Sequence, residues 1–270
     1  MRNIIIILFL PLFVFSQQVL INQLPDNINS NNAEINFVQI NDSTAYFTVV
    51  SEIESNIESN IYKSTFVEGD WSKKRYTNYN SDIFNTGNIS FSEKGRTFFN
   101  ICNNEMKDCK IVYLESNTKE GFYQMPPFFS EKALNTQAFT IRHSLLEVMY
   151  FVSDRKGGFG GLDIWLSIID SNGNFGIPIN AGNKINSSSD EITPFYNKHD
   201  GMLYFSSNKI GGRGGFDIYS AEGKLNLWKE AKNWQDINTN QDELYLTFYD
   251  QNSGYFSSNR KGAKFSISKI

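Results

Sequence analysis

Histidine and cysteine are scarce in this sequence, which has two of each among 270 residues. Two thiols and two imidazoles far apart in the sequence fall short of a four-ligand zinc site, so we expect no metal and no cofactor. The sequence also lacks a G-x-S-x-G turn, and no helical pattern follows its glycine-rich stretches. These absences exclude a serine-hydrolase elbow and a phosphate-binding loop. His143 and His199 are interpreted as packing or surface residues.

Long apolar runs are missing after the first sixteen residues, so no transmembrane helix of about 20 apolar residues is expected. Residues 1–3 are a short basic start, and residues 4–15 form an apolar run interrupted only by Pro11. This pattern predicts a signal peptide over residues 1–16, cut between Ser16 and Gln17. Because Gln17 is not a cysteine, we expect no lipid anchor. The predicted location is the periplasm, the cell surface or the medium, peripheral to the membrane at most.

An excess of basic residues is absent as well. Without Arg2, 24 basic residues remain against 29 acidic ones, which gives the mature chain a net charge of −5. That balance disfavours nucleic acid and anionic lipid as partners.

What the sequence does contain is a repeat. YFVSDRKGGFGGLDIW at residues 150–165 returns as YFSSNKIGGRGGFDIY at 204–219 and, shortened, as YFSSNRKGAKFSIS at 255–268. The copies begin 54 and 51 residues apart, and weaker copies begin at Tyr46 and Phe98. Self-similarity at such a period marks a repeat architecture. Five repeats therefore fill the chain.

Each repeat reads as four short strands. Alternating apolar and polar residues predict the strands, and glycine-rich turns separate them. An earlier strand is expected to open some repeats, at residues 28–37, 185–195 and 237–248. The fold class is therefore all-β: a five-bladed β-propeller of four-stranded antiparallel blades. The single domain spans 17–270, with blades at about 28–76, 88–125, 135–179, 185–234 and 237–270. Residues 18–23 are expected to form the outermost strand of the fifth blade. That strand would cover a sheet edge that is otherwise open.

The repeated motif resembles the TolB-like, WD-like propeller repeats of Bacteroidetes-type envelope proteins. This resemblance implies an exported, non-catalytic interaction or scaffold module that is not an enzyme and is monomeric alone. Its partners would be envelope proteins, as in a secretion or motility apparatus. The alternative is a carbohydrate-active enzyme, a glycosidase, or a glycan-binding lectin that uses the axial funnel. A hydrolase should show unique acids at the channel mouth, whereas a scaffold should show an exposed apolar patch.

Repeated acids favour a structural role. The pairs at residues 190–191 and 242–243 have the residue types of glycoside hydrolysis. They recur at matching positions, however, whereas such enzymes use unique acids near the axis. We therefore expect Glu34, Glu191 and Glu243 to cap backbone N–H groups or to meet the repeated cations Arg155, Lys209 and Arg260.

The other motif residues are also interpreted as structural. Asp154, Asn208 and Asn259 end a strand and are expected to start a turn. Glycines are expected where φ is positive or where backbones approach closely. The GGFGGLD loop resembles a calcium-binding β-roll turn, but its aspartate comes one position late and its spacing is far above nine residues. The remaining motif residues are Gly157, Gly158, Gly161, Asp163, Gly211, Gly212, Gly215 and Asp217.

The two cysteines flank one polar turn of the second repeat. An exported compartment permits disulfides. We therefore predict a bridge between Cys102 and Cys109 across a hairpin, with two free buried thiols as the alternative.

Overall fold

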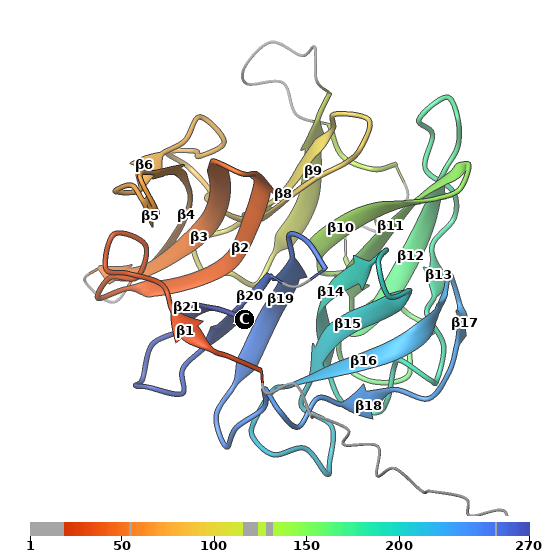
Figure 1. Ribbon diagram of the computed structural model, residues 1–270. Helices are drawn as coiled ribbons and strands as arrows, with labels where there is room; N and C mark the ends of the chain where they lie inside the picture. Colours follow the sequence, from red (N-terminus) through yellow and green to blue (C-terminus); the bar gives the residue numbers. More distant parts are fainter. Residues whose placement is uncertain (1–18, 54–55, 116–123, 128–131, 252) are drawn as a thin grey trace, which may run out of the picture.

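The computed structural model describes residues 19–53, 56–115, 124–127, 132–251 and 253–270. Within these ranges, five antiparallel sheets stand around a common axis as the blades of a five-bladed β-propeller (Figure 1). This arrangement confirms the predicted fold class. Nothing in the described ranges forms a helix long and apolar enough to cross a membrane.

The strands follow the blades in chain order. Blade 1 holds β2 (Ala33–Asn41), β3 (Thr44–Ile53), β4 (Asn56–Val67), β5 (Asp70–Trp71) and β6 (Arg75–Tyr76). Blade 2 holds β7 (Asn85–Phe91), β8 (Thr97–Cys102) and β9 (Cys109–Leu114). Blade 3 holds β10 (Asn135–His143), β11 (Leu146–Ser153), β12 (Asp163–Ile169) and β13 (Ile179–Asn180). Blade 4 holds β14 (Glu191–Asn197), β15 (Met202–Ser207), β16 (Asp217–Lys224), β17 (Leu227–Trp228) and β18 (Lys232–Asn233). Blade 5 holds β19 (Glu243–Phe248), β20 (Gly254–Ser258), β21 (Ser266–Lys269) and the N-terminal β1 (Asn22–Gln23).

The first strand of every blade lies at the axis. β2, β7, β10, β14 and β19 each contact the next around the ring, and β19 contacts β2. The following strands of each blade pair outward in order. Whatever lies on the axis is therefore built from these five inner strands.

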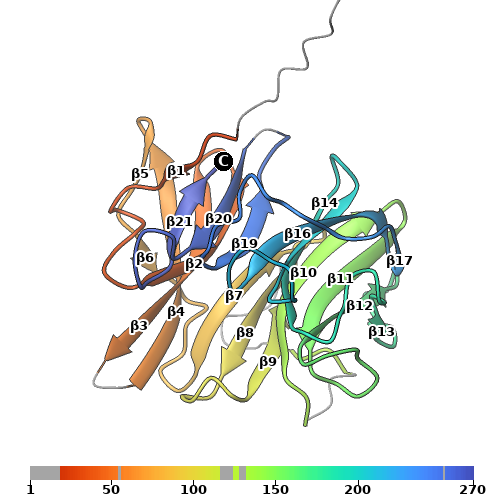
Figure 2. The same ribbon diagram turned by 90° about the horizontal axis from the view of Figure 1, so that it is seen from below.

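The ring closes through β1. Asn22 pairs with Lys269 and Gln23 with Ser268, so the N-terminal strand is the outermost strand of blade 5 (Figure 2). The strand lies where it was predicted, but only two residues of the expected 18–23 pair, and residue 18 lies outside the described ranges. The predicted signal peptide over residues 1–16 lies outside them too.

The repeated aromatic pairs fill the space between the blades. The second residue of each pair is fully or almost fully buried, and these residues are Phe47, Phe99, Phe151, Phe205 and Phe256. Large aromatic side chains bury more apolar area than most other side chains, so these positions supply much of the core. Successive residues of a strand point to opposite faces of the sheet, so the two residues of each aromatic pair lie on opposite faces of their blade.

The stretches expected to open repeats as strands are strands only in their later part. β2, β14 and β19 begin at Ala33, Glu191 and Glu243. In each Ile-Asn-Ser/Thr triplet before them, the isoleucine ends a turn and the next two residues lie outside any strand. Their asparagines pair with a neighbouring blade, as described below.

Candidate functional site

Each glycine-rich loop folds over the aspartate that follows it. Asp163 accepts hydrogen bonds from Phe159 N at 2.6 Å and from Gly160 N at 3.1 Å. Asp217 accepts the equivalent bonds in blade 4. Gly157 and Gly211 have φ of 94° and 95°, a conformation that other residues rarely adopt.

The same loops grip the next blade. A Cβ at Gly160 would lie 2.2 Å from the carbonyl oxygen of Ser189, and one at Gly214 would lie 1.8 Å from that of Gln241. We call these two loops, residues 157–162 and 211–216, the glycine clasps. A Cβ at Gly161 or Gly215 would meet an aspartate carboxylate of the next blade, whereas one at Gly158 or Gly212 would meet the aspartate of its own loop. The close approach of two blades therefore requires glycine at the third and fourth glycine positions of each clasp.

The repeated acids are occupied by structural hydrogen bonds. Glu191 is fully buried and accepts bonds from Ser187 N at 2.8 Å, Ser187 Oγ at 2.6 Å and Ser207 Oγ at 2.8 Å. Glu34 and Glu243 are equally buried and are held in the same way by the residue four positions earlier. These carboxylates cap turns and are not part of the lining of the axial pocket described below.

The repeated cations behave differently from one another. Arg260 reaches Glu243 at 3.1 Å, whereas Lys209 lies over the ring of Tyr219 at 3.8 Å. Burial lowers the pKa of Lys209, and the charge of Glu191 opposes that effect. In blade 3 the inner strand begins with Asn135, and Arg155 donates to its side-chain oxygen at 2.6 Å.

Asp154, Asn208 and Asn259 have a role beyond the expected turn. Their side-chain oxygens accept N–H bonds from the residue just before the inner strand of the same blade, at 2.8 to 2.9 Å. They therefore tie the first strand to the second. Of the three, Asn259 also begins a turn, because its carbonyl oxygen accepts the N–H of Gly262 at 3.0 Å.

Four asparagines join neighbouring blades in a way that the sequence analysis missed. Asn186 accepts from Ile164 N at 2.8 Å and donates to Ile164 O at 2.9 Å, so its amide pairs like a strand residue. Asn29, Asn80 and Asn238 make the same two bonds to Ile267, Ile61 and Ile218. The recurring Ile-Asn-Ser/Thr triplet was the signal for three of them.

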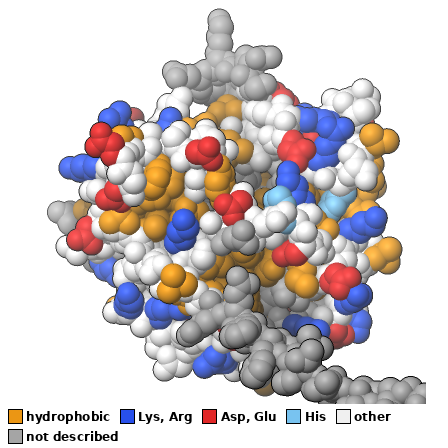
Figure 3. Space-filling model, viewed as in Figure 1, with side chains coloured by type: hydrophobic (Ala, Val, Ile, Leu, Met, Phe, Trp, Pro, Cys, Tyr) orange, Lys and Arg blue, Asp and Glu red, His pale blue; other side chains and the backbone are white. Residues whose placement is uncertain are grey.

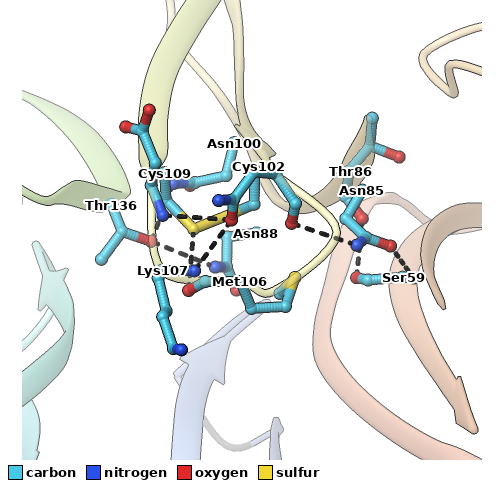
Figure 4. Close-up of a disulfide and its surroundings, with 12 residues drawn as sticks. Ser59, Asn85, Thr86, Asn88, Asn100, Cys102, Met106, Lys107, Cys109 and Thr136 are labelled. Carbon is cyan, nitrogen blue, oxygen red and sulfur yellow. Dashed lines mark hydrogen bonds between the residues drawn. A yellow bond between two sulfur atoms is a disulfide. The ribbon is translucent and has the colours of Figure 1, made fainter. Parts of the chain in front are cut away.

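Blade 2 has a disulfide. Cys102 and Cys109 are bonded, with their Cα atoms 4.1 Å apart across the β8–β9 hairpin (Figure 4). Asn85 lies nearby and accepts a hydrogen bond from Ser59 N of blade 1 at 2.6 Å. No group of three or more His, Cys, Asp or Glu side chains that could hold a metal ion occurs in the described part of the chain.

A pocket of about 330 Å³ lies on the axis and is lined by all five inner strands. Every inner strand carries a β-bulge at the same register, as shown by the shifts in pairing. The first bulge residue has φ between 52° and 56° in all five blades, and none is glycine. We call these five residues the bulge ring: Asn36, Asn88, Gln137, Thr193 and Tyr245. Bulges re-aim side chains, and strained non-glycine residues concentrate at functional sites.

The walls of the axial pocket are aromatic. Phe139 and Phe195 pack with ring centroids 4.7 Å apart, and Phe195 contacts Phe248 at 6.2 Å. The other phenylalanine and tyrosine residues of the lining are Phe91, Tyr196, Tyr245 and Tyr249. Figure 3 shows hydrophobic side chains gathered near the middle of one face of the propeller. Aromatic walls above a polar floor are the usual composition of a small-molecule site.

Charged residues at the pocket mouth are not repeated. Five positions beyond the bulge ring, the blades carry Asn41, Glu93, Arg142, Lys198 and Asp250. Glu93 of blade 2 and Lys198 of blade 4 form an ion pair of 3.7 Å past the intervening blade 3. Both line the pocket, together with His199.

The pKa values of two tyrosines in the pocket are raised by their surroundings. Burial raises the pKa of Tyr245 in the bulge ring far above its usual value, so its hydroxyl stays neutral. At the mouth, Tyr249 donates a hydrogen bond to Asp42, and that bond raises the pKa of Tyr249. Asp42 is therefore a second carboxylate bonded to the pocket wall.

His143 lies at the same end of blade 3 but outside the lining. Burial lowers its pKa, and the charge of Lys224 lowers it further. Its ring packs edge-on against Tyr196 at 4.4 Å. It is a packing residue, as the sequence indicated.

Exposed apolar side chains are spread over the molecule. The most exposed ones are Leu20, Ile83, Leu145, Ile177, Ile210 and Leu227, which lie on or beside different blades. The unrepeated charged residues Glu93 and Lys198 line the axial pocket instead.

No protein-family model matches the sequence, and no curated protein matches it. Solved structures do match the fold. A thermostable family-43 glycoside hydrolase is 13% identical, with a TM-score of 0.56 over 90% of this chain and 91% of that one. A family 117 glycoside hydrolase produced by the marine bacterium Zobellia galactanivorans is 11% identical, with a TM-score of 0.56 over 93% and 89%. An endo-arabinase from Bacteroides thetaiotaomicron is 13% identical, with a TM-score of 0.54 over 92% and 97%.

These neighbours correct the functional expectation. At such identities the likeness shows the fold, and each of these folds belongs to a carbohydrate-active enzyme. The expectation of a non-catalytic interaction module that is not an enzyme was therefore wrong. Its physical basis was the repetition of Asp190-Glu191 and Asp242-Glu243, but those acids are structural and say nothing about the pocket. The comparisons favour the carbohydrate-active alternative.

Proposed function

We propose that this protein is a carbohydrate-active propeller that binds a saccharide in the axial pocket and hydrolyses its glycosidic bond. The observation that carries the proposal is the axial pocket itself, with half-buried aromatic rings, an amide-rich floor and unrepeated charges at its mouth. Aromatic side chains offer an apolar face and a few placed polar groups fix orientation, which suits a ring with C–H faces and hydroxyl edges. The fold of the neighbouring glycoside hydrolases supports the same class.

Two carboxylates carry the chemistry in this proposal. Glycoside hydrolysis needs a proton donor to the leaving oxygen and a second carboxylate that acts on water or on the sugar. Glu93 lines the pocket on blade 2, and Asp42 is bonded to the lining residue Tyr249 on blade 5. Glu93 and Asp42 thus reach the mouth from the adjacent blades 2 and 1.

The test is hydrolysis of defined linear oligosaccharides. Arabino-, xylo-, galacto- and gluco-oligosaccharides are incubated with the protein, and released sugars are measured by chromatography. Glu93→Gln should reduce the rate by about 10²–10⁴-fold, the usual contribution of a general acid or base. Glu105→Gln, an exposed surface variant of the β8–β9 turn, is the matched control and should keep full activity.

The outcomes separate clearly. Hydrolysis would be rejected if the unaltered protein cleaved none of the sugars that it binds and Glu93→Gln bound them equally well. The protein would then be a glycan-binding protein. Absence of any binding would reject the proposal.

We also propose that the protein acts outside the cytoplasm. The pattern of residues 1–16 supports export. The bond between Cys102 and Cys109 supports it as well, because such bonds persist in oxidising compartments.

A further inference from the structure

The bulge ring forms the floor of the axial pocket. The lining includes the five ring residues and residues after them on each inner strand, and no described residue before the ring on any inner strand contributes. The pocket therefore opens only toward the mouth. On the opposite side, the inner strands hold the buried carboxylates and amides that brace the blades.

Hydrogen bonds across the axis hold this floor together. Tyr245 of blade 5 is almost fully buried, and its hydroxyl accepts a bond from Gln137 Nε2 of blade 3 at 3.2 Å. Gln137 Oε1 in turn accepts the N–H of Thr193 on blade 4 at 2.7 Å. These three residues, which we call the axial plug, tie three blades together.

The axial plug forms because blade 3 has an apolar residue at a position where blades 1 and 2 have a polar one. In blades 1 and 2, the polar side chains of Thr48 and Asn100 accept the N–H of the next blade's bulge residue, at 3.0 Å each. The equivalent residue of blade 3 is Val152, which has no acceptor. Gln137 supplies the acceptor for Thr193 instead, and this fixes its amide over the axis.

The floor also has unused polar capacity. The side-chain oxygens of Asn36 and Asn88 have no hydrogen-bond partner in the structure. The Tyr245 oxygen accepts the Gln137 amide, and its own proton is still free to be donated. A buried polar group without a partner is costly, so a small shift of the Asn36 or Asn88 side chain that let a ligand hydroxyl bond its oxygen would be favourable.

We propose that the axial pocket takes the end of a saccharide chain and excludes its interior, so that the protein acts on chain ends. The inference rests on the proposed function. A pocket of about 330 Å³ is at the small end of the range of about 300–1,000 Å³ for ligand sites. With a closed floor it has one entrance, and a polymer cannot pass through it. The axial plug is the element that imposes this limit.

The experiment compares one linkage at different chain lengths. For an oligosaccharide that binds, affinity is measured by calorimetry for short oligomers and for the long polymer of the same linkage. End binding predicts that affinity per chain stays constant while affinity per sugar unit falls in proportion to chain length. Affinity per sugar unit that stays constant would overturn the inference and leave the proposed function intact. Failure of every saccharide to bind would reject both.

A variant of the plug tests its role. Gln137→Gly fits the backbone, because glycine readily adopts the positive φ of this position. It removes the bonds to Tyr245 and Thr193, and we expect about tenfold weaker binding of short oligomers, as for the loss of one buried polar contact. Glu68→Gly changes a residue of the same φ in an exposed turn remote from the pocket and should bind as the parent does. Equal affinities for Gln137→Gly and the parent protein would exclude the plug from recognition.

Discussion

Blades 3 and 4 differ from blades 1 and 2 in how they hold the following blade. Blades 3 and 4 use glycine clasps, in which a loop lies against the backbone of the next blade. Blade 1 has instead the long β3–β4 hairpin, whose Ser59 N–H donates to Asn85 of blade 2. Blade 2 is bonded to blade 3 through the side chain of Asn100, and its disulfide braces its own hairpin. All four blades nevertheless share the bulge that forms the pocket floor. The contacts that join neighbouring blades thus differ from blade to blade, whereas the bulge that forms the pocket floor is the same in each.

The difference explains which residues repeat. A glycine in a clasp is fixed by contact with the backbone of the next blade, so each clasp requires the same residue. The bulge ring keeps one backbone conformation but has a different polar side chain in most blades. In this molecule the repeated residues hold the blades together, and the residues that differ at equivalent positions of the inner strands line the axial pocket.

The largest expected effect comes from breaking a clasp. Gly214→Ala places a Cβ against the Gln241 carbonyl oxygen, which cannot move without displacing the inner strand of blade 5. We expect the free energy of unfolding to fall by about 3 kcal/mol, as for overpacking at a rigid site. The measurement is urea unfolding of both Gly214→Ala and a control variant, Gly262→Ala. Gly262 lies in the shortened copy of the motif, and a Cβ there would contact nothing. Equal midpoints for the two variants would show that the clasp does not hold the blades.

A smaller effect is expected from removing the brace of blade 2. Replacing Cys102 and Cys109 together by serine releases a loop whose ends are seven residues apart in sequence. Loop-closure entropy predicts a loss of about 2–3 kcal/mol. Thermal unfolding with and without reductant checks this, since the serine variant should no longer respond to reductant. A reductant effect that persists in the variant would contradict the assignment.

The smallest expected effect concerns the buried acids. Glu191→Gln keeps the size of the side chain but replaces one acceptor oxygen by a donor among Ser187 and Ser207. We expect a loss of about 1–3 kcal/mol in the free energy of unfolding. Catalytic activity per folded molecule should not change, because Glu191 is outside the pocket. Loss of activity at unchanged stability would instead make this acid catalytic.

Much of the frame could be predicted from the sequence. The copies beginning at Tyr150 and Tyr204 gave the strand register and the blade count, and the closing strand was predicted at the correct edge. The bonds from Asn208 and Asn259 to the residue before their inner strand were not predicted, because a local turn and such a bond require the same residue type. The resemblance to envelope propeller repeats remains a prediction.

The site could not be predicted in this way. Asn36 and Asn88 are of a type that tolerates positive φ, but Gln137, Thr193 and Tyr245 are not, so no residue preference marks the ring. The pocket exists only where five strands from distant parts of the chain meet. Glu93 stands in a hairpin turn, where a charged residue needs no special explanation.

Closure of the ring has a consequence for how the protein folds. Asn29 pairs with Ile267 across 238 positions of sequence, and β1 pairs with β21 over a similar distance. Synthesis runs from the N-terminus, so β1 must wait for its partner until the rest of the propeller has been made. Contacts of such long range make folding slow. During that interval β1 has no partner strand, so a chaperone that shields unpaired strands would act on this protein chiefly until β21 pairs with β1.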